Sequence, residues 1–267
     1  MNKDAVAETT RFWDEKARHN SSMPSIAVGV DDPLRNRCIE KSQQAVIPGV
    51  IRAAVADLQS QCDRVLDFGC GVGRWIPTLD TCFSAYHGVD ISSEMLNIAR
   101  QEFPGKTFSK LNNLKIDAAD TSIDFALCVA VLHHNTYINQ DAMLDEFSRV
   151  VRLGGQLLLF EANGPRVPAS TFSIFYPRLE ADWIEAAAKA GFRHLGTTGT
   201  CYSYADRVVR KWFSRRFAAK PIIYRVCAFL DSYVMPYLTR FLPSRVHERL
   251  AMRFEREGVT TGAKNEA

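Results

Sequence analysis

Three glycines, Gly69, Gly71 and Gly73, stand at alternate positions directly after a short apolar run at 64–68. Glycine tolerates positive φ and has no Cβ, so a sharp turn from strand to helix can bring backbone N–H groups close to a ligand. In α/β proteins such a turn at the carboxyl end of the first strand is a common binding site. The spacing therefore predicts a ligand site formed largely by backbone.

An acid, Asp90, ends the next apolar run, 86–90, seventeen positions beyond Gly73. The oxygens of a carboxylate only accept hydrogen bonds, so Asp90 could bind both hydroxyls of a ribose or, alternatively, cap a helix. A dinucleotide-binding fingerprint would also need glycine at position 74, where the chain has Arg74. An NAD-dependent oxidoreductase is therefore the less favoured interpretation of this pattern.

Two histidines and a glutamate follow later apolar runs. His133 and His134 come after the run 124–131, and Glu161 ends the run 156–161. The carboxyl ends of parallel strands share one sheet edge, so these groups should lie near the glycine turn. A neutral histidine, with an ordinary pKa of roughly 6.5, can take a proton from an attacking hydroxyl. We expect His134 to be the catalytic base, with His133 or Glu161 as second candidates. Alternatively, one histidine supports the loop through a backbone hydrogen bond.

The elements that must position these residues alternate between strand and helix. Strands are expected at 64–68, 86–90, 107–109, 124–131, 156–161 and 192–197, and helices at 94–101, 140–150 and 179–190. Ser92 or Ser93 should cap the first of these helices, and Gly191 should end the last. This order predicts an α/β fold with a doubly wound, mostly parallel sheet covered by helices on both faces. Alternation at 251–255 predicts a seventh strand, antiparallel at the sheet edge.

Helical segments flank this core. A helix is expected at 33–58, interrupted at Pro48, and an amphipathic segment around Phe12 and Trp13 should form a lid or cover the sheet edge. The segment 221–242 is apolar on most sides, which predicts burial against its own domain or a dimer partner, with a membrane-surface helix as the alternative.

The composition is that of an ordinary globular protein. The chain has 267 residues, 33 Lys+Arg, 30 Asp+Glu and 46% hydrophobic residues, which excludes a disordered or fibrous protein. Seven scattered cysteines disfavour a disulfide framework or a zinc ribbon, so no metal is expected. The polar N-terminus shows no secretory signal, which predicts a cytoplasmic protein. Between positions 205 and 257 twelve Lys/Arg face five Asp/Glu, a bias that suits a phosphate-bearing substrate, an anionic membrane surface, nucleic acid or simply a solvated helix.

Four motifs in order, VLDFGCGVGRW, GVDISSEMLNIAR, DFALCVAVLHH and RLGGQLLLFE, resemble class I S-adenosylmethionine-dependent methyltransferases of the small-molecule type. The resemblance covers about residues 62–200 and implies a Rossmann-like seven-stranded fold. It also implies S-adenosyl-L-methionine as cofactor and S-adenosyl-L-homocysteine as product. The cofactor residues that it implies are Asp67, Gly69, Cys70, Gly71, Gly73, Asp90, Ile91, Leu111, Asn112 and Ala130.

Within that set the resemblance implies particular contacts. Asp67 and the glycine loop would surround the methionine part, Asp90 would hold the ribose hydroxyls and Ile91 would pack on the adenine. An Asp that the family often has after the third strand is missing, and Asn112 would replace it through its side-chain carbonyl. Enzymes of this superfamily that methylate amino groups of nucleic acids carry an Asn/Asp-Pro-Pro-aromatic motif after the fourth strand. This chain reads AVLHH there, so no nucleic-acid partner is expected.

The resemblance thus implies one methyltransferase domain over 1–267. We expect an N-terminal helical cover (1–60), a cofactor-binding core (61–200), a basic helical region (201–257) that acts as a substrate lid or interface and contains the last strand, and a frayed tail (258–267). The expected activity is methyl transfer to a hydroxyl of a small molecule, with a glycan or phosphate-bearing lipid as a candidate acceptor. A non-catalytic scaffold of the same fold is the alternative. Candidate interactions are peripheral contact at the inner membrane surface and a homodimer through the C-terminal helix.

Overall fold

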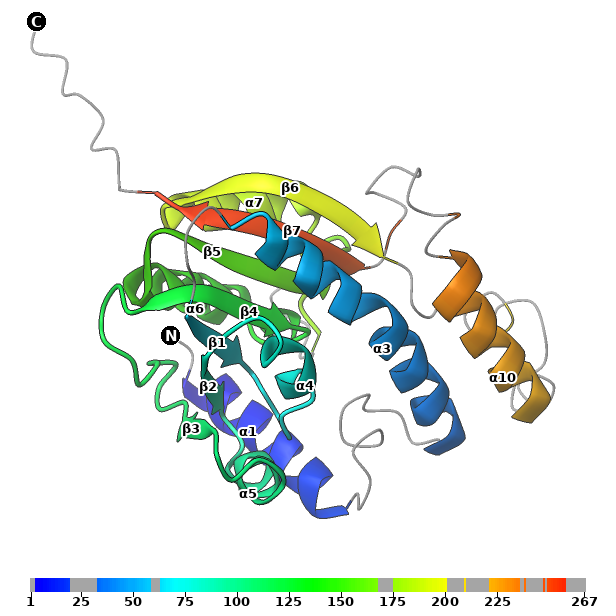
Figure 1. Cartoon of the computed structure of the whole chain (residues 1–267). Helices are drawn as coiled ribbons and strands as arrows, with labels where there is room; N and C mark the ends of the chain where they lie inside the picture. Colours follow the sequence, from blue (N-terminus) through cyan, green and yellow to red (C-terminus); the bar gives the residue numbers. More distant parts are fainter. Residues whose placement is uncertain are drawn as a thin grey trace, which may run out of the picture.

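The computed structural model describes residues 3–19, 33–58, 63–167, 175–200, 209, 221–235, 238, 247 and 249–257. Its centre is a seven-stranded sheet of order β3-β2-β1-β4-β5-β7-β6 (Figure 1). The strands are β1 (Arg64–Phe68), β2 (Ala85–Asp90), β3 (Thr107–Lys110), β4 (Ile123–Val129), β5 (Val151–Ala162), β6 (Phe192–Thr200) and β7 (Arg249–Arg256). Strands β1 to β5 pair in parallel, and β7 is antiparallel to both of its neighbours. The expected seven-stranded, mostly parallel fold is confirmed.

Helices cover both faces of this sheet (Figure 1). One face packs on α3 (Pro33–Ala56) and α4 (Ile76–Leu79), and the other on α6 (Tyr137–Val150) and α7 (Glu180–Lys189). The remaining helices are α1 (Lys3–His19), α5 (Ser93–Glu102), α10 (Pro221–Phe229), the 3-10 turn η1 (Leu132–His134) and the π-helical turn η2 (Leu230–Val234). Within the described ranges, no helix is both long and apolar enough to cross a membrane.

Local signals in the sequence fix several of these boundaries. The hydroxyl of Ser92 accepts the Met95 N–H at 3.1 Å and so caps α5, as expected. Gly191 ends α7 with φ +84°, a conformation that a side chain disfavours. The parallel strands β1 and β4 are almost continuously apolar because helices cover the sheet on both sides.

Several expectations for the elements are wrong: β5 begins at Val151, before the glycine pair at 154–155, and β6 ends at Thr200. Strand β4 ends at Val129 instead of at position 131, because Ala130 turns the chain with φ +59°. Strand β7 does not lie at the sheet edge but between β5 and β6, where both of its faces are covered: Leu250, Ala251 and Met252 are all buried. Helix α3 continues through Pro48, because the buried side chains around it keep the helix packed on the sheet.

The C-terminal helical segment packs on its own domain, which is one of the expected alternatives, and within this chain residues 221–235 are buried on one side only. Helix α10 packs against α3, where Ser42 donates a hydrogen bond to the Ala228 carbonyl at 3.5 Å. Tyr224 and Cys227 are buried there. The expected frayed tail, and most of the basic residues between 205 and 220, lie outside the described residues.

Candidate functional site

The glycine loop follows β1 and has φ +72° at Gly69, +55° at Gly71 and +83° at Gly73. A Cβ at Gly69 would overlap the Val131 side chain, and one at Gly73 would lie 2.8 Å from Ile76. Packing therefore requires those two glycines. At Gly71, by contrast, no described atom lies within 4 Å of the Cβ position, so this glycine borders open space into which a ligand could fit.

The Asp90 carboxylate, at the end of β2, holds this loop in place. Its Oδ2 accepts the Gly71 N–H and its Oδ1 accepts the Ser92 N–H, both at 2.8 Å. The carboxylate keeps acceptor capacity beyond these bonds, since it offers about four acceptor sites. Burial raises the pKa of Asp90, and the backbone N–H groups oppose that rise. The residue can therefore order the glycine loop and bind ligand hydroxyls together.

Asp67, near the end of β1, and Cys70, in the glycine loop, are both buried. The Tyr86 hydroxyl donates to Asp67 Oδ2 at 2.9 Å. Burial, with a smaller contribution from the negative charge of Asp90, raises the pKa of Asp67 to about 7. Burial also raises the pKa of the Cys70 thiol well above its usual value, so this cysteine is an inert packing group instead of a nucleophile.

The other predicted cofactor residues follow the carboxyl ends of neighbouring strands. Ile91 is half-buried after β2, and Leu111 is buried after β3, with its N–H bonded to the Asp90 carbonyl at 2.8 Å. Asn112 is exposed next to it. Ala130 follows β4, and its N–H binds the Phe160 carbonyl at 2.8 Å. The structure thus brings the predicted residues to one edge of the sheet.

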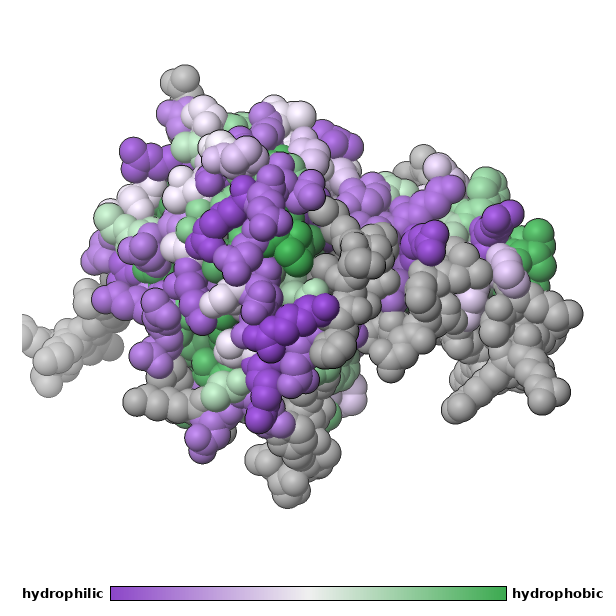
Figure 2. Space-filling model, turned by 90° about the horizontal axis from the view of Figure 1, so that it is seen from below, coloured by the Kyte–Doolittle hydropathy of each residue, from purple (hydrophilic) through white to green (hydrophobic). Residues whose placement is uncertain are grey.

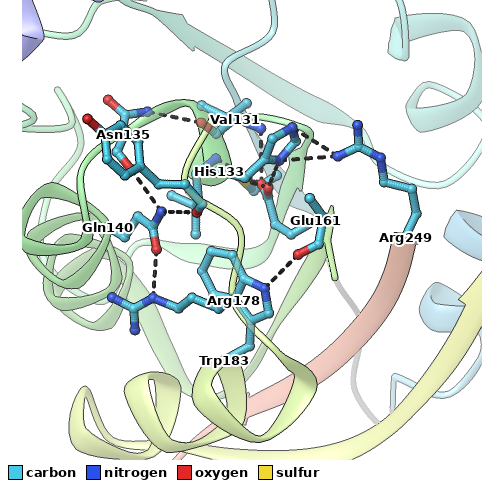
Figure 3. A network of polar contacts seen from close by, with 12 residues as sticks. Val131, His133, Asn135, Gln140, Glu161, Arg178, Trp183 and Arg249 are labelled. Carbon is cyan, nitrogen blue, oxygen red and sulfur yellow. Dashed lines mark hydrogen bonds and ion pairs between the residues drawn. The ribbon is translucent and has the colours of Figure 1, made fainter. Parts of the chain in front are cut away.

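The loop after β4 is organised by Glu161, which is fully buried on β5 (Figure 3). Its Oε1 accepts the backbone N–H groups of Val131 at 3.0 Å and Leu132 at 2.9 Å, and its Oε2 accepts that of His133 at 3.1 Å. Burial raises the pKa of Glu161, while these three N–H groups favour the carboxylate. This carboxylate therefore holds the loop and does not face open space.

His133 is also fully buried, and both of its ring nitrogens have partners. Nδ1 bonds to Glu161 Oε2, and Arg249 Nη1 lies 2.9 Å from Nε2 (Figure 3). An arginine can only donate, so Nε2 accepts and the proton sits on Nδ1, where it is donated to Glu161. Burial and the Arg249 charge lower the pKa of His133 well below its usual value. The geometry makes His133 and Glu161 positioning residues for the loop.

His134 differs from these two groups because its side chain is only partly buried. Its ring centroid lies 4.3 Å from that of His133 and 5.6 Å from that of Trp13 on α1, in an edge contact. Helix α1 is anchored nearby, since the Ser92 hydroxyl donates to Asp14 at 2.5 Å. Ala17 of the same helix packs with Val72 of the glycine loop. Helix α1 therefore lies beside the glycine loop and His134.

Three arginines support the site in ways that sequence reasoning missed. Arg249 was counted only within the basic region, although it meets His133 from β7. Arg74, which breaks the dinucleotide fingerprint, pairs with Glu40 of α3 at 3.0 Å and stacks on Trp75 at 4.4 Å. In the sequence, only the position of Arg74 directly after Gly73 pointed to a role at the site.

The third, Arg178, fixes the chain after β5. Its Nε donates to Gln140 Oε1 at 2.7 Å (Figure 3). The Gln140 amide in turn donates to the carbonyls of Asn135 and Tyr176, both at 2.8 Å. The Tyr176 N–H binds the His133 carbonyl at 2.6 Å. The loops after β4 and β5 are thereby joined into one wall beside the histidines.

Comparisons with known proteins agree with this architecture. Residues 66–159 match a family described as "Methyltransferase domain". A demethylmenaquinone methyltransferase of Tropheryma whipplei is 29% identical over 154 residues, 57% of this chain and 60% of that protein. A ubiquinone/menaquinone biosynthesis C-methyltransferase of Campylobacter jejuni is 30% identical over 105 residues, 37% of this chain and 44% of that protein. The chain thus spans about half of the length of these relatives.

Solved structures show the same fold at low sequence identity. An S-adenosylmethionine-dependent methyltransferase of Leishmania major has a TM-score of 0.63 at 12% identity, with 94% of this chain and 82% of that chain covered. A chain of a complex that contains the Haloferax volcanii Trm112 methyltransferase activator has a TM-score of 0.56 at 16% identity, with 86% and 100% covered. The resemblance to class I S-adenosylmethionine-dependent methyltransferases is therefore confirmed: residues 66–159 match the family model, and the solved structures share the fold.

Proposed function

We propose that this protein transfers the methyl group of S-adenosylmethionine to a hydroxyl of a small molecule. The observation that carries the proposal is the pairing of Gly71 with Asp90, which places a carboxylate with spare acceptor capacity next to open space at the carboxyl edge of the sheet. These residues fit the cofactor, because a ribose offers two hydroxyl donors and the loop offers close approach to backbone. When bound, the cofactor supplies a methyl group on a positively charged sulfur.

The residues that would hold the cofactor follow from their places at this edge. Asp90 would accept the ribose hydroxyls. Ile91, Leu111 and Asn112 would lie along the adenine, and Asp67 and Ala130 would border the methionine part. Because methyl transfer is an in-line displacement, most of the protein's contribution is positioning of the acceptor oxygen, which the joined loops after β4 and β5 would provide.

His134 is the base that we propose for the acceptor hydroxyl. Among the three candidate groups, His133 and Glu161 are fully buried and bonded to each other, whereas His134 is partly buried at the same edge. A neutral imidazole there would take the proton as the oxygen attacks, which contributes roughly a hundredfold or more to the rate.

The acceptor class is tested by following methyl transfer from labelled S-adenosylmethionine. The acceptors to compare are hydroxylated aromatic compounds, glycans and phosphate-bearing lipids. His134→Ala should lower kcat by about a hundredfold at neutral pH, and less at alkaline pH, where hydroxyls ionise unaided. His194→Ala, on β6 with its ring bonded to Thr197 at 2.9 Å, is the matched control and should keep its activity. Equal loss in both variants would contradict the assignment of the base.

The same assay distinguishes two alternatives to hydroxyl methylation. The names of the relatives favour a second candidate, methylation at a carbon of a quinone-type acceptor, and a quinone precursor therefore belongs in the acceptor set. A protein that binds the cofactor but forms S-adenosylhomocysteine with none of these acceptors would instead support a non-catalytic scaffold.

A further inference from the structure

Four large side chains, Ile222, Val226, Phe229 and Tyr233, form an exposed apolar stripe along α10 and η2. They are 62%, 49%, 58% and 54% exposed. Their spacing of three and four residues places them on one side of the helix, and the rings of Phe229 and Tyr233 are 5.4 Å apart. Figure 2 shows hydrophobic side chains at the surface of this projecting part of the molecule, next to hydrophilic ones.

The apolar stripe does not pack on the protein's own core, because the opposite side of α10 makes that contact. Tyr224, Cys227 and Ala228 are buried against α3, and Ser42 binds the Ala228 carbonyl. The helix is thus fixed with its second apolar face outward. An apolar face of this kind on a helix held at the surface is typical of an interaction site.

The sequence that contains the stripe is basic. Positions 207–230 hold seven Lys/Arg and no Asp/Glu, and Arg225, on α10 itself, is exposed. Asp231, the next acid along the chain, is buried. An exposed apolar helix face in a basic stretch of sequence matches the surface of an anionic bilayer, where apolar side chains enter the acyl boundary and cations meet lipid phosphates.

A second copy of the chain fits this surface less well. Four half-exposed side chains offer roughly 400 Å², about half of what each partner buries in a stable interface. Two such basic segments would also repel each other. We therefore propose that the apolar stripe of α10 and η2 docks this protein on an anionic membrane surface.

The experiment is co-sedimentation of the full chain with vesicles of phosphatidylcholine, alone or mixed with phosphatidylglycerol, at low and high salt. The chain should sediment with the mixed vesicles at low salt and less so at high salt. The double variant Val226→Ser with Phe229→Ser should lower vesicle partitioning about tenfold, because it removes two inserted side chains. Leu153→Ser with Leu179→Ser, 59% and 47% exposed on other elements, is the matched control.

The outcomes separate a lipid partner from a protein partner. Loss of sedimentation in the stripe variant alone, with an unchanged thermal unfolding midpoint, supports the proposal. Failure of the unaltered chain to sediment with the mixed vesicles overturns it, as does equal loss in the control variant. A concentration-dependent dimer in light scattering that the stripe variant abolishes, with no vesicle binding, would assign the stripe to a second copy instead.

Discussion

At the scale of single residues, the candidate site depends on buried charges that hold backbone in place. Asp90 fixes the glycine loop through the Gly71 N–H, and Glu161 fixes the loop after β4 through three N–H groups. Such carboxylates are costly to bury, so each must retain its hydrogen-bond partners. Cofactor and acceptor would therefore meet a surface whose shape is set before they bind.

Asp67 should make the stability of the fold depend on pH in an unusual direction. Its pKa rises from 3.8 to about 7 in the folded protein, so the folded state holds its proton more tightly than the unfolded chain. The stabilisation is complete below about pH 4 and is lost as pH rises to 7, by at most ~1.4 kcal/mol per pH unit. Asp67→Asn should remove this loss and stabilise the protein near pH 8, with little effect near pH 4.

Urea unfolding at several pH values measures how the stability of the unaltered protein and of Asp67→Asn depends on pH. Asp124→Asn is the control of opposite sign, because the Arg152 side chain and two backbone N–H groups lower the pKa of Asp124. That variant should be less stable at neutral pH and approach the unaltered protein below about pH 4. A pH-independent effect of Asp67→Asn would contradict the raised pKa of this residue.

Arg249 should stabilise the loop after β4 through His133. Arg249→Met leaves the histidine without the donor at Nε2 and Glu161 without a nearby cation, which should cost about 2 kcal/mol. The pKa of His133, followed by NMR, should rise, because the Arg249 charge helps to lower it. Arg193→Met, which breaks only exposed ion pairs, should cost less than about 1 kcal/mol. An unchanged histidine pKa would exclude the proposed contact.

At the scale of elements, α3 contains two residues that are unfavourable inside a helix. Pro48 and Gly49 both lie inside this helix, although each disfavours helix. No described atom lies within 4 Å of a Cβ at Gly49, so Gly49→Ala should stabilise the protein by about 0.5–1 kcal/mol in thermal or urea unfolding. Gly155→Ala is the contrasting control and should destabilise, since its Cβ would lie 2.9 Å from two carbonyl oxygens.

The elements of the core could be predicted because their signals are local. Apolar runs fixed the strands, and Ser92 and Gly191 marked helix ends through caps that involve neighbouring residues. The place of β7 could not be predicted, because alternation describes the faces of a strand and not its neighbours. The continuity of α3 also depends on tertiary packing, which outweighs the local cost of Pro48.

Part of the candidate site could be predicted because its residues are close together in the sequence. The glycines and Asp90 lie in a compact motif, and the structure places them together. Arg249 lies 116 positions from His133, and Arg74 reaches back to Glu40, so neither contact leaves a pattern in the sequence. The burial of His133 and Glu161 likewise arises only when the loops after β4 and β5 meet.

At the scale of the whole molecule, three parts gather around one edge of the sheet. The glycine loop and Asp90 form the proposed cofactor side, the loop after β4 forms the proposed acceptor side, and α1 contacts both through Trp13 and Asp14. Helix α10 packs on α3, away from that edge of the sheet (Figure 1). The side chains of its apolar stripe are exposed. The proposed chemistry and the proposed membrane contact therefore use different surfaces and can be tested separately.

The most direct test of the central claim is isothermal titration calorimetry with S-adenosylmethionine and S-adenosylhomocysteine, with NADH as a control ligand. We predict micromolar binding of both sulfur nucleotides, no binding of NADH, and at least a tenfold loss of affinity in Asp90→Ala, since the ribose loses its carboxylate. Asp145→Ala, an exposed acid on α6, should bind as the unaltered chain does. Unchanged affinity in Asp90→Ala, or binding of NADH alone, would contradict the cofactor site described above.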